Sequence, residues 1–249
     1  MKTLGALPLL PLLLLLGLSF AARAEEPEQS WSYKLTPTHY SNSNLPSAWD
    51  VNLRGNRGAQ TVWFGHFEQG ADALNGKFQQ SRIGYENAVQ TSWGVLVPSL
   101  QLATHGFAGG SLSAQVGGPD AYGLVGFGRT NLQPYYNLNF DPNDAITLGH
   151  ARRLPDRSML TAYCTWDDRL GTSQKVAHVL WRKSLDDQQR LTLDLALKKG
   201  RPEAGEPVVH GHMASIGLDH GPLFFKLTVD RKVNFSDTRQ VRTQIGARF

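Results

Sequence analysis

The sequence predicts an all-β fold, an antiparallel transmembrane β-barrel, and three observations support this. Polar and apolar residues alternate in many short segments. The N-terminus has the order of an export signal, and no later apolar run is long enough for a spanning helix. Since only helices and closed barrels satisfy every backbone polar group in lipid, an exported membrane chain without such helices is expected to be a barrel.

Residues 1–24 are expected to form a cleavable signal peptide. Lys2 precedes a leucine-rich apolar run over 9–20, and Ala22-Arg23-Ala24 follows it, before the acidic Glu25. The run is shorter than the roughly 20 residues that a membrane-spanning helix requires. Residues 25–249 show no long repeat or linker and are expected to form one domain.

Three segments alternate most clearly, as in Leu191, Leu193, Leu195 and Leu197, which fall on one face of an extended strand. The segments 223–229 and 240–249 repeat this pattern. Weaker candidates are 31–41, 48–55, 60–68, 77–87, 90–104, 111–117, 121–130, 144–153, 158–167, 175–184 and 208–219. Because short neighbours such as 48–55 and 60–68 could merge, we expect about a dozen strands, with about 14 as the alternative.

The last strand also carries a family resemblance. Val241, Ile245, Ala247 and Phe249 share one face, and an aromatic stands at position 249. This segment resembles the closing strand of Gram-negative outer-membrane β-barrels, whose members typically end in Phe or Trp. The resemblance implies that 25–249 form a single outer-membrane β-barrel in contact with outer-membrane lipid and lipopolysaccharide. It also implies assembly by the barrel-assembly machinery through the C-terminal strand.

Turn lengths predict the orientation of this barrel. The tight turns at 154–157, 185–188 and 220–222 alternate with longer connections at 200–207 and 132–144. Outer-membrane barrels have short periplasmic turns and longer outside loops. Both ends of the barrel chain are therefore expected in the periplasm.

Composition excludes several function classes. Without Lys2 and Arg23 the chain has 23 Lys and Arg against 21 Asp and Glu, interspersed along the strands, which argues against a nucleic-acid partner. The single Cys164 excludes an internal disulfide. His210 and His212 share a face, but no third ligand is identifiable, so neither a metal nor another cofactor is predicted.

One constellation suggests catalysis. His39 and Ser41 share a strand face, so the imidazole could take the proton of the hydroxyl, and Asp50 is the nearest carboxylate that could orient the ring. Parity puts His39 and Ser41 on the face that meets lipid. The apolar positions of the next strand, Trp49 and Val51, would turn Asp50 inward.

The segment His39-Tyr40-Ser41-Asn42 resembles the His-x-Ser-Asn segment of outer membrane phospholipase A and of the lipid A 3-O-deacylase. In both families His is the base and Ser the nucleophile. Their third residue, Asn or Glu, comes about a dozen residues beyond the Ser, where this chain has Leu53.

Three functions stay open at this stage. The first is a small outer-membrane barrel of structural or passive-pore type, with Asp194, Lys198, Lys226, Asp230, Arg242 and Arg248 pointing inward. The second is an outer-membrane serine esterase acting on phospholipid or lipid A. The third is a periplasmic β-rich binding protein, a sandwich or lipocalin-like fold, whose apolar strand faces would be interior.

Overall fold

The computed structural model describes residues 29–71, 76–130, 145–167 and 171–249, and Trp31–Phe249 form one compact unit. A 3₁₀ turn, η1 (Val233–Phe235), lies between the last two strands. The strands are β1 (Ser32–Asn42), β2 (Ala48–Arg57), β3 (Gln60–Gln69), β4 (Phe78–Asn87), β5 (Val89–Thr91), β6 (Gly94–Ala103), β7 (Phe107–Gly118), β8 (Ala121–Thr130), β9 (Ile146–Arg153), β10 (Met159–Asp167), β11 (Gln174–Ser184), β12 (Gln189–Gly200), β13 (Val209–His220), β14 (Leu223–Arg231) and β15 (Arg239–Arg248).

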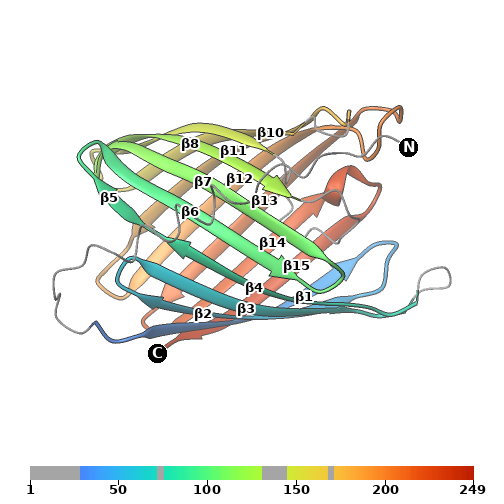
Figure 1. Cartoon of the computed structure of the whole chain (residues 1–249), viewed down its shortest axis with the longest axis horizontal. Coiled ribbons are helices and arrows are strands. Elements are labelled where there is room, and N and C mark those ends of the chain that lie inside the picture. Colours follow the sequence, from blue (N-terminus) through green and yellow to red (C-terminus); the bar gives the residue numbers. More distant parts are fainter. Residues whose placement is uncertain (1–28, 72–75, 131–144, 168–170) are drawn as a thin grey trace, which may run out of the picture. The chain divides into compact units, whose positions relative to one another are not determined.

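The strands form a closed antiparallel barrel of 14 strands, because β4 and β5 are two parts of one strand interrupted at Ala88 (Figure 1). Both parts pair with β6, and every other strand pairs with its neighbour in sequence. The fourteen-strand alternative is confirmed. A dozen is too few because β2 and β3 do not merge: Gly58, with φ of 57°, makes a tight turn between them.

The barrel closes where β1 pairs with β15, as the resemblance of the last segment to the closing strand of outer-membrane barrels implied. The register runs from Lys34 opposite Arg248 to Asn42 opposite Gln240. Beyond the strand end, Tyr33 and Phe249 exchange two backbone hydrogen bonds with N···O distances of 2.6 and 3.0 Å. Their rings also stack, with centroids 5.8 Å apart.

The wall is apolar outside and polar inside. Large apolar side chains point outward and are exposed, for example Leu195 at 61% and Leu197 at 70%. Charged side chains such as Asp50 and Asp194 point inward and are buried. This polarity contradicts the periplasmic binding-protein hypothesis, in which the apolar faces would be interior. Among the described residues, no helix is long and apolar enough to cross a membrane.

The connections predicted to be tight lie at one end of the barrel and those predicted to be long lie at the other, where 43–47 and 104–106 are also short. At the end that contains Tyr33 and Phe249 they have two to five residues: 58–59, 92–93, 119–120, 154–158, 185–188 and 221–222. At the other end, which we call the long-loop end, they are 43–47, 70–77, 104–106, 131–145, 168–173, 201–208 and 232–238. The expected signal peptide and the whole of the predicted 132–144 loop lie outside the described residues.

Three inward-facing aromatic rings lie against a glycine of the neighbouring strand. They pair Trp63 with Gly84, Tyr163 with Gly149 and Phe224 with Gly246. A ring that covers a cross-strand glycine shields backbone from water and fixes the strand register. The ring of Phe224 is also flanked by the Lys34 ammonium at 4.3 Å and the Arg248 guanidinium at 5.0 Å from its centroid.

Replacing Gly246 by Ala is expected to destabilise the barrel, because the new methyl group would meet the Phe224 ring and the Leu35 carbonyl. Overpacking of this kind costs about 1–3 kcal/mol. Urea unfolding of the refolded barrel, followed by tryptophan fluorescence, measures the loss. Gly118→Ala is the matched control, since nothing lies within 4 Å of its added methyl. Equal midpoints for the two variants would contradict the packing argument.

Candidate functional site

The barrel interior contains a polar cavity of about 590 Å³. Its wall is formed by Lys34, Thr36, Thr38, Tyr40, Asp50, Asn52, Arg54, Trp63, Arg82, Glu86, Ser99, Gln101, Ser111, Arg242 and Gln244. Four of these side chains are cationic and two are carboxylates. The charges come from β1, β2, β4 and β15, whereas β6 and β7 contribute only Ser and Gln. The cavity is therefore asymmetric, with a charged wall facing a neutral one.

Ion pairs in this wall bridge strands that are not neighbours. The Arg82 guanidinium on β4 makes two hydrogen bonds to the Asp50 carboxylate on β2, at 2.9 and 2.8 Å. It crosses β3 above Gly65, where any larger residue would collide with it. Arg54 and Glu86 form a second bridge of 3.1 Å across the same strand. These contacts brace the charged wall and hold its side chains against the barrel.

A second cavity of about 250 Å³ lies beside β10–β15. In its wall the Lys198 ammonium contacts the Asp230 carboxylate at 2.5 Å, and His178 Nδ1 lies 3.0 Å from Asp194. Arg242 and Gln244 line both cavities. These two side chains therefore stand between the two halves of the polar interior.

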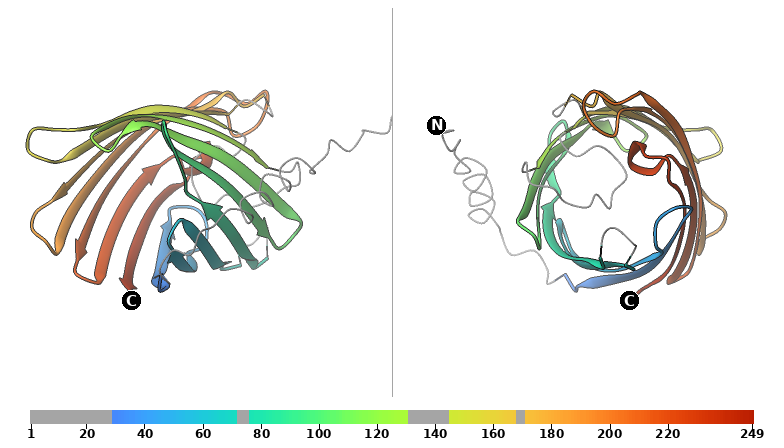
Figure 2. Two further views of the ribbon diagram at one scale, coloured as in Figure 1. Left: turned by 60° about the vertical axis from the view of Figure 1, so that its left-hand side comes forward. Right: turned by 90° about the vertical axis from the view of Figure 1, so that its right-hand side faces the viewer.

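The β14–β15 connection folds into the barrel at the long-loop end (Figure 2). Phe235 of η1 packs with Val176, Ala196 and Met213 on the inner wall. On its other side, Val233 packs with Tyr40, Ala48 and Phe67. This connection joins apolar clusters on both sides of the β14–β15 hairpin and covers part of the inner wall there.

All six charged residues that were predicted to point inward do so. Asp194, Lys198 and Asp230 are buried, Lys226 and Arg242 line cavities, and Arg248 hydrogen-bonds Asp219 inside the barrel. The sequence analysis missed Arg54, Arg82 and Glu86. The alternation of side chains between the two faces of a strand could have placed Arg82 and Glu86 inside, because both lie on the face opposite to that of the outward Ile83.

The three predicted catalytic residues fall on two faces of the wall. His39 and Ser41 point outward near the long-loop end, on the face expected for them. The His39 ring packs against Trp49, with centroids 4.5 Å apart. Asp50 points inward and is held by Arg82, so it does not orient His39.

A second His and Ser pair, which the sequence analysis missed, lies on the same outer face. His66 on β3 and Ser81 on β4 are directly opposite in register, and His66 Nδ1 lies 2.9 Å from Ser81 Oγ. The residues are 15 positions apart, so only the strand register brings them together. Within the described ranges, no three His, Cys, Asp or Glu side chains gather as a metal site requires.

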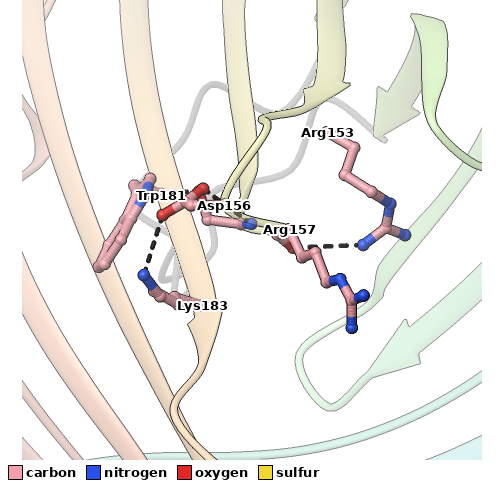
Figure 3. Close-up of polar contacts among 6 residues, drawn as sticks. Arg153, Asp156, Arg157, Trp181 and Lys183 are labelled. Carbon is pink, nitrogen blue, oxygen red and sulfur yellow. Dashed lines mark hydrogen bonds and ion pairs between the residues drawn. The ribbon is translucent and has the colours of Figure 1, made fainter.

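The β9–β10 turn, at the end opposite the long loops, contains a compact polar cluster (Figure 3). The Asp156 carboxylate accepts hydrogen bonds from the Ser158 hydroxyl at 2.6 Å, the Lys183 ammonium at 2.9 Å and the Ser158 amide at 3.1 Å. Trp181 Nε1 in turn donates to the Ser158 hydroxyl at 2.9 Å. The Ser158 hydroxyl and then Lys183 lower the pKa of Asp156 to about 2.

This shift predicts a pH dependence with a definite sign. The folded-state pKa lies below the ordinary carboxyl value, so the stabilisation is complete above that value and is lost as pH falls toward about 2. Asp156→Asn should therefore lower stability by a constant amount above about pH 5, and the difference should shrink between about pH 4 and pH 2. Urea unfolding of both proteins across this range measures it, and a difference independent of pH would contradict the assignment.

Comparison with known proteins supports the architecture. No protein-family model and no curated protein sequence matches the chain. Among solved structures, the chain is similar to the Acinetobacter baumannii outer membrane protein Omp33, with a TM-score of 0.53 and 8% identity over 90% of this chain and 100% of that one. The fold is that of an outer-membrane β-barrel. Together with the apolar outer face, it places the chain in the outer membrane.

Two further similar structures have lower scores. Acinetobacter baumannii OccAB3 has a TM-score of 0.48 and 7% identity, over 88% of this chain and 98% of that chain. Salmonella typhi OmpF, solved with daunomycin, has a TM-score of 0.46 and 8% identity, over 88% of this chain and 97% of that chain.

Proposed function

We propose that this barrel is a narrow passive pore for small hydrophilic solutes, with a preference for anions. The observation that supports it is the polar interior, in which the 590 Å³ cavity and the smaller one share Arg242 and Gln244. Four cations against two carboxylates in the larger cavity give its wall a net positive charge. A cavity wall with a net positive charge raises the local concentration of counter-ions, here anions.

Single-channel recording of the refolded protein in planar bilayers tests the pore. We expect discrete conductance steps and, in a KCl gradient, a reversal potential that indicates preference for chloride over potassium. Arg242→Gln should move the reversal potential toward zero, because it removes a positive charge common to both cavities. Thr243→Ser, on the outward face of the same strand, is the matched control. Correctly folded protein without conductance steps would overturn the pore.

A second candidate is a serine esterase acting on phospholipid or lipid A, with Ser41 as nucleophile and His39 as base. Its support is the outward position of both side chains near the long-loop end, where an ester in the outer leaflet would lie. Asp50 has no part in this version of the proposal, because its carboxylate is held by Arg82 on the other face.

Release of fatty acid from phospholipid or lipid A in mixed micelles tests the esterase. The wild type is expected to release fatty acid and Ser41→Ala to abolish the release, because the nucleophile is removed. Ser81→Ala serves as the comparison, since Ser81 contacts His66 on the same outer face. Equal release by wild type and Ser41→Ala would remove the assignment to Ser41, and loss in Ser81→Ala alone would transfer it to the second pair.

The partners that we propose follow from the outward face of the wall. Outer-membrane lipid and lipopolysaccharide would cover the apolar band. The barrel-assembly machinery would engage β15, whose outward face includes Val241 and the 60% exposed Ile245.

A further inference from the structure

Six basic side chains follow the outward face of β11–β15 at the long-loop end. We call them the basic band, and they are Lys175, Lys199, His210, His212, Arg231 and Arg239. Strand register makes the band continuous across five strands. Lys199 pairs with both Lys175 and His210, and Arg231 pairs with both His212 and Arg239.

The band lies where the apolar outer face ends. On β12 the outward positions run from Leu191 through the exposed Leu195 and Leu197 to Lys199. At about 3.3 Å per residue and a tilt of about 40°, Leu191 and Lys199 differ in height by roughly 20 Å, close to the height of the lipid-facing band of such barrels. The basic side chains are therefore at the level of lipid headgroups.

A groove of about 530 Å³ runs along this part of the outer wall. Ala177 and Leu197 provide apolar surface, whereas Lys175, Lys199, His210 and His212 provide the basic edge. None of the side chains that line the groove is acidic. A lipid with an acyl chain and an anionic headgroup matches this combination.

The band has an excess of like charge that the described part of the chain does not neutralise. Lys175 lies directly opposite Lys199, and Arg231 lies directly opposite Arg239. Like charges in such positions repel each other across the sheet. Other exposed lysines do have acidic partners, as in Lys77 with Glu68 and Lys183 with Asp156. Within the part of the chain that the structure describes, no ion pair involves the four Lys and Arg side chains of the band.

We propose that the basic band is a binding site for lipid A, the phosphorylated glycolipid anchor of lipopolysaccharide. The long-loop end of an outer-membrane barrel faces the outside, where the outer leaflet is built from this glycolipid. Lipid A has a phosphate at each end of a disaccharide. The band likewise has one like-charge pair on β11–β12 and another on β14–β15, about 12–16 Å apart at the usual strand spacing and with a two-residue offset along β13.

In this arrangement the phosphates lie between the paired cations and neutralise their repulsion. Arg is well suited to this role because its guanidinium binds phosphate through two parallel hydrogen bonds. An acyl chain occupies the groove beside Ala177 and Leu197. The site does not depend on whether the interior conducts ions, because the six basic side chains of the band, together with Ala177 and Leu197, lie on the outer face.

Native mass spectrometry of the refolded, full barrel in detergent tests the proposal by measuring affinity for diphosphoryl lipid A. Each basic side chain near an anionic lipid surface contributes about fivefold in affinity. We therefore expect the double variant Lys175→Gln with Lys199→Gln to bind roughly 25-fold more weakly, and Arg231→Gln with Arg239→Gln to lose a similar amount. Lipid A without phosphates should bind weakly to the wild type.

Two control variants isolate the position of the charges. Lys77→Gln removes an outward-side cation at the same end on the opposite wall, and Lys183→Gln removes one at the other end, so both should keep wild-type affinity. Heat-dependent migration in gels verifies that each variant is folded before binding is measured. Equal binding by the wild type and both double variants would overturn the site. Equally tight, band-dependent binding of phosphatidylglycerol would overturn the assignment to lipid A.

Discussion

The whole structure depends on one constraint: every backbone amide and carbonyl in the wall must find its partner in a neighbouring strand, because lipid offers none. The pairing of β1 with β15 meets this constraint where the wall joins its first and last strands. Once that seam is made, each strand has a fixed neighbour on both sides. The two faces of every strand then meet two different environments, lipid outside and a polar interior inside.

The closed wall also determines how the interior is stabilised. Inward side chains converge on the concave face, so an ion pair can reach across an intervening strand, as Asp50 and Arg82 do above Gly65. Lys198 and Asp230 do the same across β13. Gly65 leaves the space that the Arg82 guanidinium occupies, and Gly84, Gly149 and Gly246 leave space for aromatic rings. Small residues of the inner wall thus make room for the charged and aromatic side chains that cross it.

Much of the fold could be predicted from sequence because a membrane barrel repeats one local signal. The alternation of polar and apolar residues located all the strands, including the weakly alternating segment 111–117. The predicted segment 90–104 contains the turn between β5 and β6. The strand count was less certain, since nothing local indicates whether 48–57 and 60–69 are one hairpin or one broken strand. Parity also predicted correctly that Asp50 faces inward, away from His39 and Ser41.

Contacts that depend on how the strands pair with one another could not be predicted from the sequence. Arg82 lies 32 residues from Asp50, and no local pattern links them. The same holds for His66 with Ser81, and for the basic band, where Lys175 and Arg239 belong to strands far apart in sequence. A lysine at a strand end is unremarkable by itself. Only when five adjacent strands present a basic residue at one height does a surface of distinct chemistry result.

Curvature accounts for the difference between the two faces of β12 at its long-loop end. Lys198 points inward, where the converging wall brings the Asp230 carboxylate to it. Lys199 points outward, where side chains diverge and its cross-strand neighbours are Lys175 and His210. Lys198 on the concave face is therefore neutralised by the protein. Lys199 on the convex face has only basic cross-strand neighbours, and this contrast with Lys198 is the basis of the lipid A site that we propose.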